Sequence, residues 1–220
     1  MKFRLLVFDW DGTIMDSEAR IVACVEAAIK DLDLPVPSRE AISNIIGLGL
    51  REAVHQLFPT GDDQLHLEIA ARYRVHFFSA EVAPSELFQG ARQTLQTLND
   101  QGYLLAVATG KGRQGLDHAL QSTGLSPLFL VTRCADETFS KPHPEMLHQI
   151  LDYTGMEPKE ALMIGDTEYD LEMARNAGMP SLGVTYGVHT ADRLQKHQPL
   201  GCVDAVDQIP GWLSRMGVGQ

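Results

Sequence analysis

One long interruption in a regular alternation of strand and helix constrains this chain more than any other feature. Short apolar segments rich in Val, Leu and Ile recur along the sequence, and the first of them ends near Asp9. The second begins only near Tyr103. A crossover between parallel strands needs a single helix of about a dozen residues, and the helical pattern over residues 90–101 already supplies it. Residues 14–85 are therefore surplus to the crossover.

The apolar segments have the pattern of strands in a parallel sheet. They lack the alternation of period two that a half-exposed strand shows, which favours strands buried on both faces. Helical patterns separate the later segments, and this order predicts an α/β fold, a Rossmann-like doubly wound parallel sheet with right-handed crossovers. The predicted strands cover residues 3–8, 103–108, 128–131, 161–164, 181–185 and 202–206, and the predicted helices cover 90–101, 113–122, 144–153 and 169–177.

The surplus segment has the pattern of a separate helical unit. Prolines and glycines, which end or interrupt helices, divide its predicted helices from one another. We therefore predict an inserted α-helical cap domain over residues 15–85 and a core domain formed by residues 1–14 and 86–220. An insertion that leaves the core just after Asp11 can act as a lid over chemistry at that point. The predicted cap helices cover residues 17–32, 38–46, 50–57 and 62–80.

Charge, hydropathy and cysteine usage disfavour several classes of protein. The 220-residue chain carries a formal charge of −11, whereas proteins that track a nucleic-acid backbone need clustered Lys and Arg. No stretch approaches the ~20 apolar residues that a membrane helix needs. Cys24, Cys134 and Cys202 have neither zinc-site nor disulfide-framework spacing, which favours free thiols in a reducing cytoplasm. We expect a cytoplasmic protein, monomer or homodimer, that binds neither nucleic acid nor membranes.

Polar residues gather where the predicted strands end. Ligands of open α/β sheets bind outside the carboxyl ends of the strands. Two aspartates two residues apart point the same way from an extended strand, and such a pair at a buried strand end needs a cation or protons to offset its charge. The polar residues are Asp9 and Asp11 after the first strand, Thr109, Gly110 and Lys111 after the second, Lys141 after the third, and Asp166, Thr167 and Asp170 after the fourth.

These residue types predict a site for Mg²⁺ and a phosphate group. Carboxylate oxygens without histidine or thiolate favour Mg²⁺, which binds one or two carboxylates, water molecules and a substrate phosphate. The Thr109 hydroxyl, the flexible Gly110 backbone and the amides of a helix that starts near Gly112 would form a phosphate cradle. Lys141 and the metal would balance the charge of the phosphate. We therefore expect a small phosphorylated metabolite as the ligand.

The same segments resemble the four motifs of the haloacid dehalogenase superfamily, in its phosphatase branch. Residues 9–13, Asp-Trp-Asp-Gly-Thr, resemble the first motif, Thr109 the second, Lys141 the third and residues 165–170 the fourth. They follow one another in the family's order, and the resemblance covers the whole chain. The position of the insertion resembles the subclass with an α-helical cap, which contains phosphoglycolate phosphatases and β-phosphoglucomutases.

The resemblance implies a chemical role for Asp9 and Asp11. Asp9 would be the nucleophile and form an aspartyl-phosphate. Asp11 would protonate the leaving alcohol and then activate the hydrolytic water. The implied activity is Mg²⁺-dependent hydrolysis of a small-molecule phosphate monoester, of the phosphoglycolate phosphatase type.

The resemblance also implies the residues that hold the phosphate and the metal. Thr109 and the Gly110 amide would hold the phosphoryl oxygens, while Lys141 offsets negative charge. Asp170 would support Lys141 or the metal from nearby. The implied Mg²⁺ ligands are Asp9, the Asp11 backbone carbonyl and Asp166.

Four residues near these motifs receive separate interpretations. Arg51 is a candidate contact for an anionic group of the substrate, because residues 47–51 resemble the substrate-specificity loop of related caps. Lys111 fits a solvated lysine near a helix start better than a substrate contact. Ser17 fits a cap of the first inserted helix, and Thr13 fits a cap of the preceding turn.

Other activities are weighed against the phosphatase. A halide leaving group needs no proton, so Asp11 disfavours a dehalogenase. A phosphonatase resembles Asp-x-Ala-Gly-Thr and adds a cap lysine, whereas the inserted region contains only Lys30. A sugar phosphomutase of the β-phosphoglucomutase type is the nearest alternative, since it returns the phosphoryl group to a sugar instead of water. A non-catalytic phosphometabolite-binding protein is a distant one, because decayed sites usually lose a residue that is present here.

Overall fold

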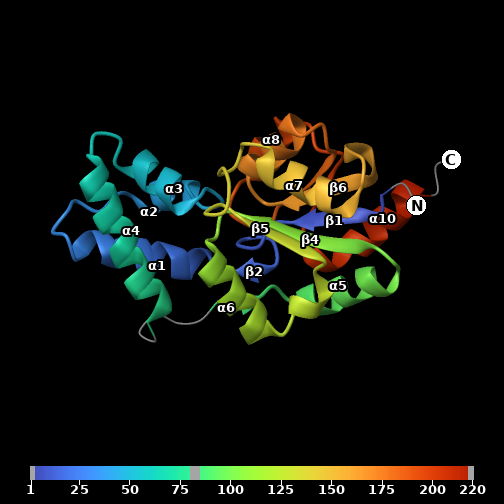
Figure 1. Cartoon of the computed structure of the whole chain (residues 1–220), viewed down its shortest axis with the longest axis horizontal. Coiled ribbons are helices and arrows are strands. Elements are labelled where there is room, and N and C mark those ends of the chain that lie inside the picture. Colours follow the sequence, from blue (N-terminus) through green and yellow to red (C-terminus); the bar gives the residue numbers. More distant parts are fainter. Residues whose placement is uncertain (1–2, 80–84, 218–220) are drawn as a thin grey trace.

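A six-stranded parallel sheet forms the centre of the molecule in the computed structural model, which describes residues 3–79 and 85–217. Its strand order is β5-β4-β1-β6-β7-β8, so the first strand lies in the middle and the chain winds outward in both directions. The predicted α/β doubly wound class is confirmed (Figure 1). The strands are β1 (Leu5–Phe8), β4 (Leu104–Thr109), β5 (Val131–Cys134), β6 (Ala161–Gly165), β7 (Ser181–Val184) and β8 (Cys202–Val203).

Helices cover both faces of this sheet and make three layers. Successive strand residues point to opposite faces, so Leu6 and Phe8 pack in one hydrophobic cluster and Leu5 and Val7 in the other. The first cluster is closed by α5 (Ala91–Asp100), α6 (Arg113–Thr123) and α10 (Ile209–Gly217), and the second by α7 (Glu145–Thr154) and α8 (Glu168–Asn176). The short helix α9 (Ala191–Gln195) lies against β7.

The remaining helices gather at one end of the molecule, beyond the carboxyl ends of the strands (Figure 1). These cap helices are α1 (Glu18–Lys30), α2 (Arg39–Asn44), α3 (Leu50–Leu57) and α4 (Asp63–Phe78). The chain leaves the core through β2 (Met15–Asp16) and returns through β3 (Glu86–Leu87), and these two strands pair antiparallel. The two connections therefore form one narrow stem beside Asp11.

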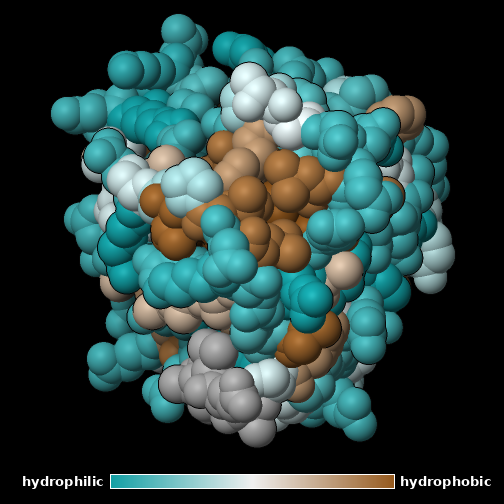
Figure 2. Space-filling model, turned by 90° about the vertical axis from the view of Figure 1, so that its left-hand side faces the viewer, coloured by the Kyte–Doolittle hydropathy of each residue, from teal (hydrophilic) through white to brown (hydrophobic). Residues whose placement is uncertain are grey.

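The cap helices have a small hydrophobic core of their own. Ile21, Val25 and Ile29 of α1 pack with Ile42 and Ile46. Figure 2 faces this end of the molecule and shows an apolar area surrounded by hydrophilic residues. So small a unit cannot cover all of its apolar surface, because the fraction of surface buried falls with size. Several side chains that pack on this core are only partly buried, among them Leu34, Leu57 and Phe58.

One predicted strand is misplaced. The pattern placed it at residues 128–131, whereas β5 covers Val131–Cys134. Residues Ser126–Leu128 form a 3-10 helix whose second residue is Pro127. β5 is the edge strand of the sheet, so its polar residues Thr132 and Arg133 are half-buried. An edge strand has no need of an apolar sequence on both faces. Among the described helices, none is long and apolar enough to cross a membrane.

Candidate active site

A buried ion-pair cluster lies where β1 ends. Asp9 follows β1 directly, and its amide donates to the Ile164 carbonyl oxygen at 2.9 Å, which continues the sheet by one residue. The Lys141 Nζ lies 2.7 Å from Asp9 Oδ1 and 2.6 Å from Asp170 Oδ1. All three side chains are at most 1% exposed. Burial lowers the pKa of Lys141, but the carboxylates of Asp170 and Asp9 outweigh it and raise that pKa, so the lysine is held as a cation.

Local structure at the start of α8 fixes Asp170. Its Oδ2 accepts hydrogen bonds from the Thr167 amide at 3.1 Å and from the Thr167 hydroxyl at 2.7 Å, which closes a reciprocal helix cap. The side chain packs directly against the strand end, because a Cβ on Gly165 would lie 2.4 Å from the Asp170 Cβ. Asp170 Oδ1 is therefore aimed at Lys141.

Asp166 lies at the end of β6 and is held from two sides. Its Oδ1 accepts from the Thr13 hydroxyl at 2.9 Å, and its Oδ2 accepts from the Val188 amide at 2.9 Å. A Cβ on Gly12, whose φ is +82°, would lie 2.2 Å from Asp166 Oδ2. Burial and the nearby Asp170 carboxylate raise the pKa of Asp166 to about 7. Thr13, interpreted from sequence as a turn cap, thus binds the carboxylate of Asp166 instead.

Three buried carboxylates could hold a metal ion together. Asp9, Asp166 and Asp170 each offer an oxygen within 4.8 Å of the others. Asp9 Oδ2 has no hydrogen-bond partner among the described residues, and burial raises the pKa of Asp9 well above its usual value although Lys141 opposes that shift. Three carboxylates face one ammonium group, so a divalent cation would balance the charge. This set of hard oxygen donors fits Mg²⁺.

Asp11 faces a different set of partners. Its Oδ1 accepts from the Ser17 hydroxyl at 2.6 Å, and its Oδ2 lies 3.0 Å from Lys111 Nζ. The Lys111 side chain is 7% exposed, and its Nζ lies 4.6 Å from the centre of the Phe77 ring. The interpretation of Lys111 as a solvated lysine is therefore wrong. Ser17 stands at the helix start but makes no side-chain cap there, because its hydroxyl binds Asp11.

The pairing of Asp11 with Lys111 could not be read from local sequence. Lys111 comes from the loop after β4, about a hundred residues along the chain, and only the parallel pairing of β1 with β4 brings that loop beside Asp11. The one sequence feature that could have indicated a role for Lys111 was its position two residues after Thr109. The Asp11 carboxylate is not in the group formed by Asp9, Asp166 and Asp170, and the predicted metal contact through the Asp11 backbone carbonyl stays a prediction.

Thr109 is the last residue of β4, and Gly110 follows it next to the cap. Thr109 is buried, and its hydroxyl accepts from the Lys111 amide at 3.1 Å. A Cβ on Gly110 would lie 2.4 Å from the carbonyl oxygen of Gly47 in the cap. Gly110 therefore permits a close approach between two backbones, which sequence reasoning had not foreseen. Two residues after Gly47, the Gly49 amide of the cap donates to the Ser140 hydroxyl of the core at 2.7 Å.

Further contacts hold the cap against the core. The Tyr169 hydroxyl donates to the Asn44 carbonyl oxygen at 2.9 Å. Arg193 donates to both carboxylate oxygens of Glu168 and also to the Asn44 side chain. These bonds join α8 and α9 of the core to the end of α2, so the cap rests directly on the edge of the site.

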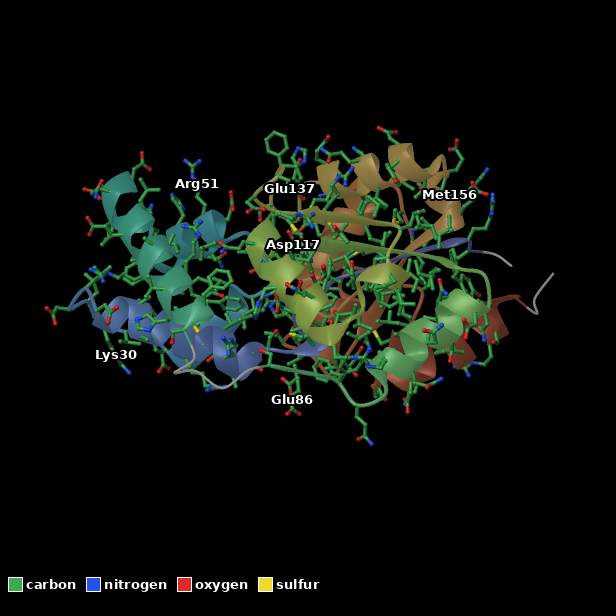
Figure 3. The ribbon with its side chains drawn as sticks, turned by 60° about the horizontal axis from the view of Figure 1, so that its bottom comes forward. Lys30, Arg51, Glu86, Asp117, Glu137 and Met156 are labelled. Atoms are coloured by element: carbon green, nitrogen blue, oxygen red, sulfur yellow. The ribbon has the colours of Figure 1, made fainter. Side chains whose placement is uncertain are left out.

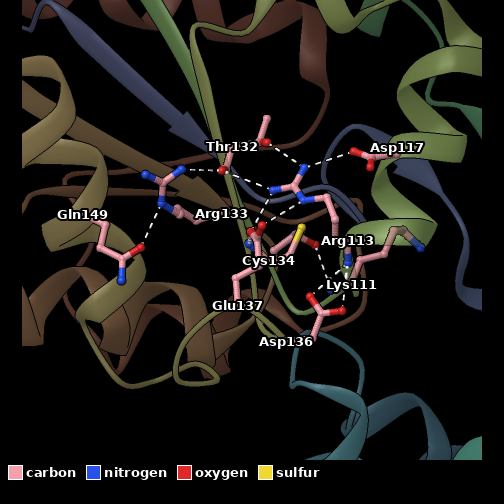
Figure 4. Close-up of polar contacts among 10 residues, drawn as sticks. Lys111, Arg113, Asp117, Thr132, Arg133, Cys134, Asp136, Glu137 and Gln149 are labelled. Carbon is pink, nitrogen blue, oxygen red and sulfur yellow. Dashed lines mark hydrogen bonds and ion pairs between the residues drawn. The ribbon is translucent and has the colours of Figure 1, made fainter.

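The loop that delivers Lys141 is held by Arg113, the first residue of α6 (Figure 4). The guanidinium donates to the two Glu137 carboxylate oxygens at 3.0 and 2.7 Å and to the Thr132 hydroxyl at 2.9 Å. The Arg113 amide donates to Asp136 at 2.9 Å. The hydrogen bond from Arg113 lowers the pKa of Glu137, so this pair stays ionised. The segment between β5 and Lys141 is thereby fixed to α6.

A cavity of about 460 Å³ lies between the cap helices and the strand ends. Asp9, Asp11, Thr109 and Gly110 line its core side. Arg51 of α3 also belongs to its lining, but the residue is exposed, and Figure 3 shows its side chain at the outer edge of the molecule. The cavity has the size and position of a substrate site.

Comparison with known proteins places these features in a family context. A family model described as haloacid dehalogenase-like hydrolase matches residues 6–184. "Probable phosphatase IndB" of Dickeya dadantii is 36% identical over 94% of this chain and 92% of that protein. The phosphoglycolate phosphatase of Aliivibrio fischeri is 32% identical over 89% of this chain and 90% of that protein. The crystal structure of a predicted phosphoglycolate phosphatase from Haemophilus somnus has a TM-score of 0.85 at 26% identity, covering 97% and 99% of the two chains.

Proposed function

We propose that this chain, which belongs to the haloacid dehalogenase-like hydrolases, hydrolyses small phosphate monoesters with Mg²⁺ through an aspartyl-phosphate on Asp9. The chain is a phosphatase of that family, and relatives that align with nearly all of it are named phosphatases or phosphoglycolate phosphatases. One observation carries the mechanism. Asp9 lines the cavity, its Oδ1 is paired with a fully buried lysine, and its Oδ2 has no hydrogen-bond partner among the described residues.

The first half-reaction transfers the phosphoryl group to Asp9. A carboxylate oxygen of Asp9 attacks phosphorus, and the bond between phosphorus and the alcohol oxygen breaks. Asp11, which lines the same cavity, gives its proton to that leaving oxygen. The product is an acyl phosphate on Asp9 and a free alcohol.

The second half-reaction restores the enzyme. Asp11, now a carboxylate, takes a proton from water, and the resulting hydroxide attacks phosphorus. The bond between phosphorus and the Asp9 oxygen breaks, so that inorganic phosphate leaves and Asp9 is again a carboxylate. One group thus serves as acid and then as base, and Ser17 and Lys111 hold it in place for both steps.

The phosphoryl oxygens would be held by Thr109, the Gly110 amide and Lys141. Lys141 Nζ lies 2.7 Å from the nucleophile, so it also stabilises negative charge that develops there. Asp9, Asp166 and the Asp11 backbone carbonyl would hold Mg²⁺, with Asp170 close by. The bound ion would supply positive charge to the phosphoryl oxygens and to Asp9.

The domain division and the cellular location also belong to this proposal. The narrow stem of β2 and β3 and the separate hydrophobic core of the cap helices support a cap over residues 15–85 on a core of 1–14 and 86–220. The three cysteines form no disulfide, which supports a cytoplasmic location.

The test replaces Asp9 with asparagine and measures hydrolysis of p-nitrophenyl phosphate with Mg²⁺. Asparagine has nearly the same shape, but its neutral amide cannot act as the nucleophile, so we expect turnover to fall at least about 10³-fold. Asp63→Asn, on an exposed residue at the start of α4, is the matched control and should retain wild-type turnover. Undiminished hydrolysis by the Asp9→Asn protein would overturn the mechanism.

A further inference from the structure

Aromatic side chains line the cavity beyond Asp11. Lys111 Nζ lies 3.0 Å from Asp11 Oδ2 and 4.6 Å from the centre of the Phe77 ring. The Phe77 ring in turn stacks on Tyr73, with 5.7 Å between the ring centres and 29° between the planes. Both aromatic residues come from α4 and line the cavity. Tyr73 and Phe77 therefore form a wall that extends from the region of Asp11, the proposed proton donor to the leaving oxygen, into the cap.

Aliphatic side chains make up much of the rest of the cap side, beside the charged residues Arg51, Glu52 and Arg74. Ile21 and Val25 of α1 line the cavity and are at most 8% exposed. Ile69 of α4 and Val54 of α3 line it and are at most 3% exposed. The cavity of about 460 Å³ lies in the usual range for sites that enclose a whole small molecule. A phosphoryl group with a two-carbon alcohol would leave much of this apolar wall without a contact.

The cations of the lining lie away from its apolar part. Within the described lining, the cationic side chains are those of Lys111, Arg51 and Arg74. Lys111 lies at the Asp11 end of the cavity, while Arg51 and Arg74 are exposed at the surface. A carboxylate that enters the apolar part of the cavity, away from Lys111, would lose its water without contacting a cation of the lining, and that loss is unfavourable.

We propose that the preferred substrate is a phosphate monoester whose alcohol carries a flat apolar or aromatic body, which lies beside Tyr73 and Phe77. The inference rests on the proposed function, because the chemistry at Asp9 and Asp11 fixes which end of the substrate enters the cap. With phosphorus at Asp9 and the leaving oxygen at Asp11, the rest of the alcohol extends along α4. Aromatic side chains bind such a body by offset stacking or edge contacts.

The experiment compares phosphate release from 2-phenylethyl phosphate, ethyl phosphate and phosphoglycolate with Mg²⁺ and the full-length chain. The first two are esters of similar primary alcohols, so their difference reports the contact with the ring and not the leaving group. We expect kcat/KM for 2-phenylethyl phosphate to exceed that for ethyl phosphate by at least about tenfold, as burial of a ring of this size predicts. Phosphoglycolate should also be a poorer substrate than 2-phenylethyl phosphate.

Two variants locate the contact. Phe77→Ala and Tyr73→Leu should each lower the ratio of kcat/KM between 2-phenylethyl phosphate and ethyl phosphate by about threefold or more, because each removes one ring from the wall. Tyr153→Ala, which removes an aromatic side chain that is 61% exposed on α7, should leave the ratio unchanged. Because the readout is a ratio between two esters, a fraction of unfolded protein cancels out of it.

The outcomes separate this inference from the function on which it rests. Hydrolysis of ethyl phosphate or phosphoglycolate that equals or exceeds hydrolysis of the phenylethyl ester would overturn the inference and leave the phosphatase mechanism intact. Unchanged ratios in both cap variants would also overturn it. Release of phosphate from none of the three esters would count against the proposed function, and the inference would fall with it.

Discussion

Replacing Gly12 with alanine tests how closely the site depends on the position of Asp166. Two effects act at this residue. Its φ of +82° is unfavourable for alanine, which costs about 1–2 kcal/mol. The new Cβ would also lie 2.2 Å from Asp166 Oδ2, whereas such contacts are essentially never under 3.0 Å, so the oxygen must move by about 0.8 Å. A displacement of this size can reduce turnover about 10²-fold, and Mg²⁺ in particular demands near-ideal ligand positions.

Gly102→Ala is the matched control for this change. Gly102 has a φ of +87°, but nothing lies within 4 Å of the position that its Cβ would occupy. Gly102→Ala should therefore lose only the free energy of unfolding that the positive φ costs, and Gly12→Ala should lose at least that much. Only Gly12→Ala should lose turnover and need more Mg²⁺ for half-maximal activity. If Gly12→Ala keeps turnover within threefold of Gly102→Ala, the claim that Asp166 must occupy this exact position is refuted.

Three further predictions follow from the buried charges. Lys141→Met leaves Asp9 and Asp170 without their cation, so we expect the free energy of unfolding in urea to fall by about 3 kcal/mol, whereas the exposed Lys159→Met should change little. The raised pKa of Asp166, about 7, means that the folded state binds the proton more tightly than the unfolded state. In EDTA, the stabilising contribution of protonated Asp166 should be complete below about pH 4. It should be lost as pH rises towards 7, by at most about 1.4 kcal/mol per pH unit. A free energy of unfolding that does not change over this pH range would contradict the raised pKa of Asp166. The Asp11→Asn variant should release one equivalent of p-nitrophenolate from p-nitrophenyl phosphate in a burst, because this leaving group needs no proton. The steady rate that follows should be about 10²-fold below that of the wild type, because the variant lacks the base that activates water. A slow rate without a burst would argue against the acyl phosphate.

The chemical residues could be predicted because each depends on a short piece of sequence. A strand that ends at Asp9 and another that ends next to Asp166 must bring both carboxylates to the same edge of a parallel sheet. The position of Lys141 before a helix, and of Asp170 in the first turn of α8, is equally local. Spacing and strand order indicated that these residues lie near one another, and the structure has them in one cluster, while their chemical roles stay a prediction.

The residues that sequence reasoning missed depend on contacts between distant segments. Lys111 reads as an ordinary lysine near a helix start until the structure shows its Nζ 3.0 Å from Asp11. Gly110 was expected to serve a phosphate, yet the close approach of the Gly47 carbonyl already requires a glycine there. The edge strand β5 was not predicted at its true position, because its half-buried residues Thr132 and Arg133 are polar and do not resemble a buried strand. The determining factor is a neighbouring strand end for Lys111, the cap for Gly110 and the place at the sheet edge for β5, and no local pattern encodes any of these.

The two sides of the cavity therefore have different physical origins and should vary independently. The core side consists of charges at strand ends, and a change there alters the bond-making steps for every ester. Much of the cap side consists of apolar side chains from α1, α3 and α4, beside Arg51, Glu52 and Arg74, and a change there acts mainly on the contact with the alcohol. Asp11 lies where the two sides meet, since it touches Lys111 of the core, which in turn packs on Phe77 of the cap. Selectivity among esters should consequently follow the α4 side chains, while the need for Asp9 and Asp11 stays the same for all of them.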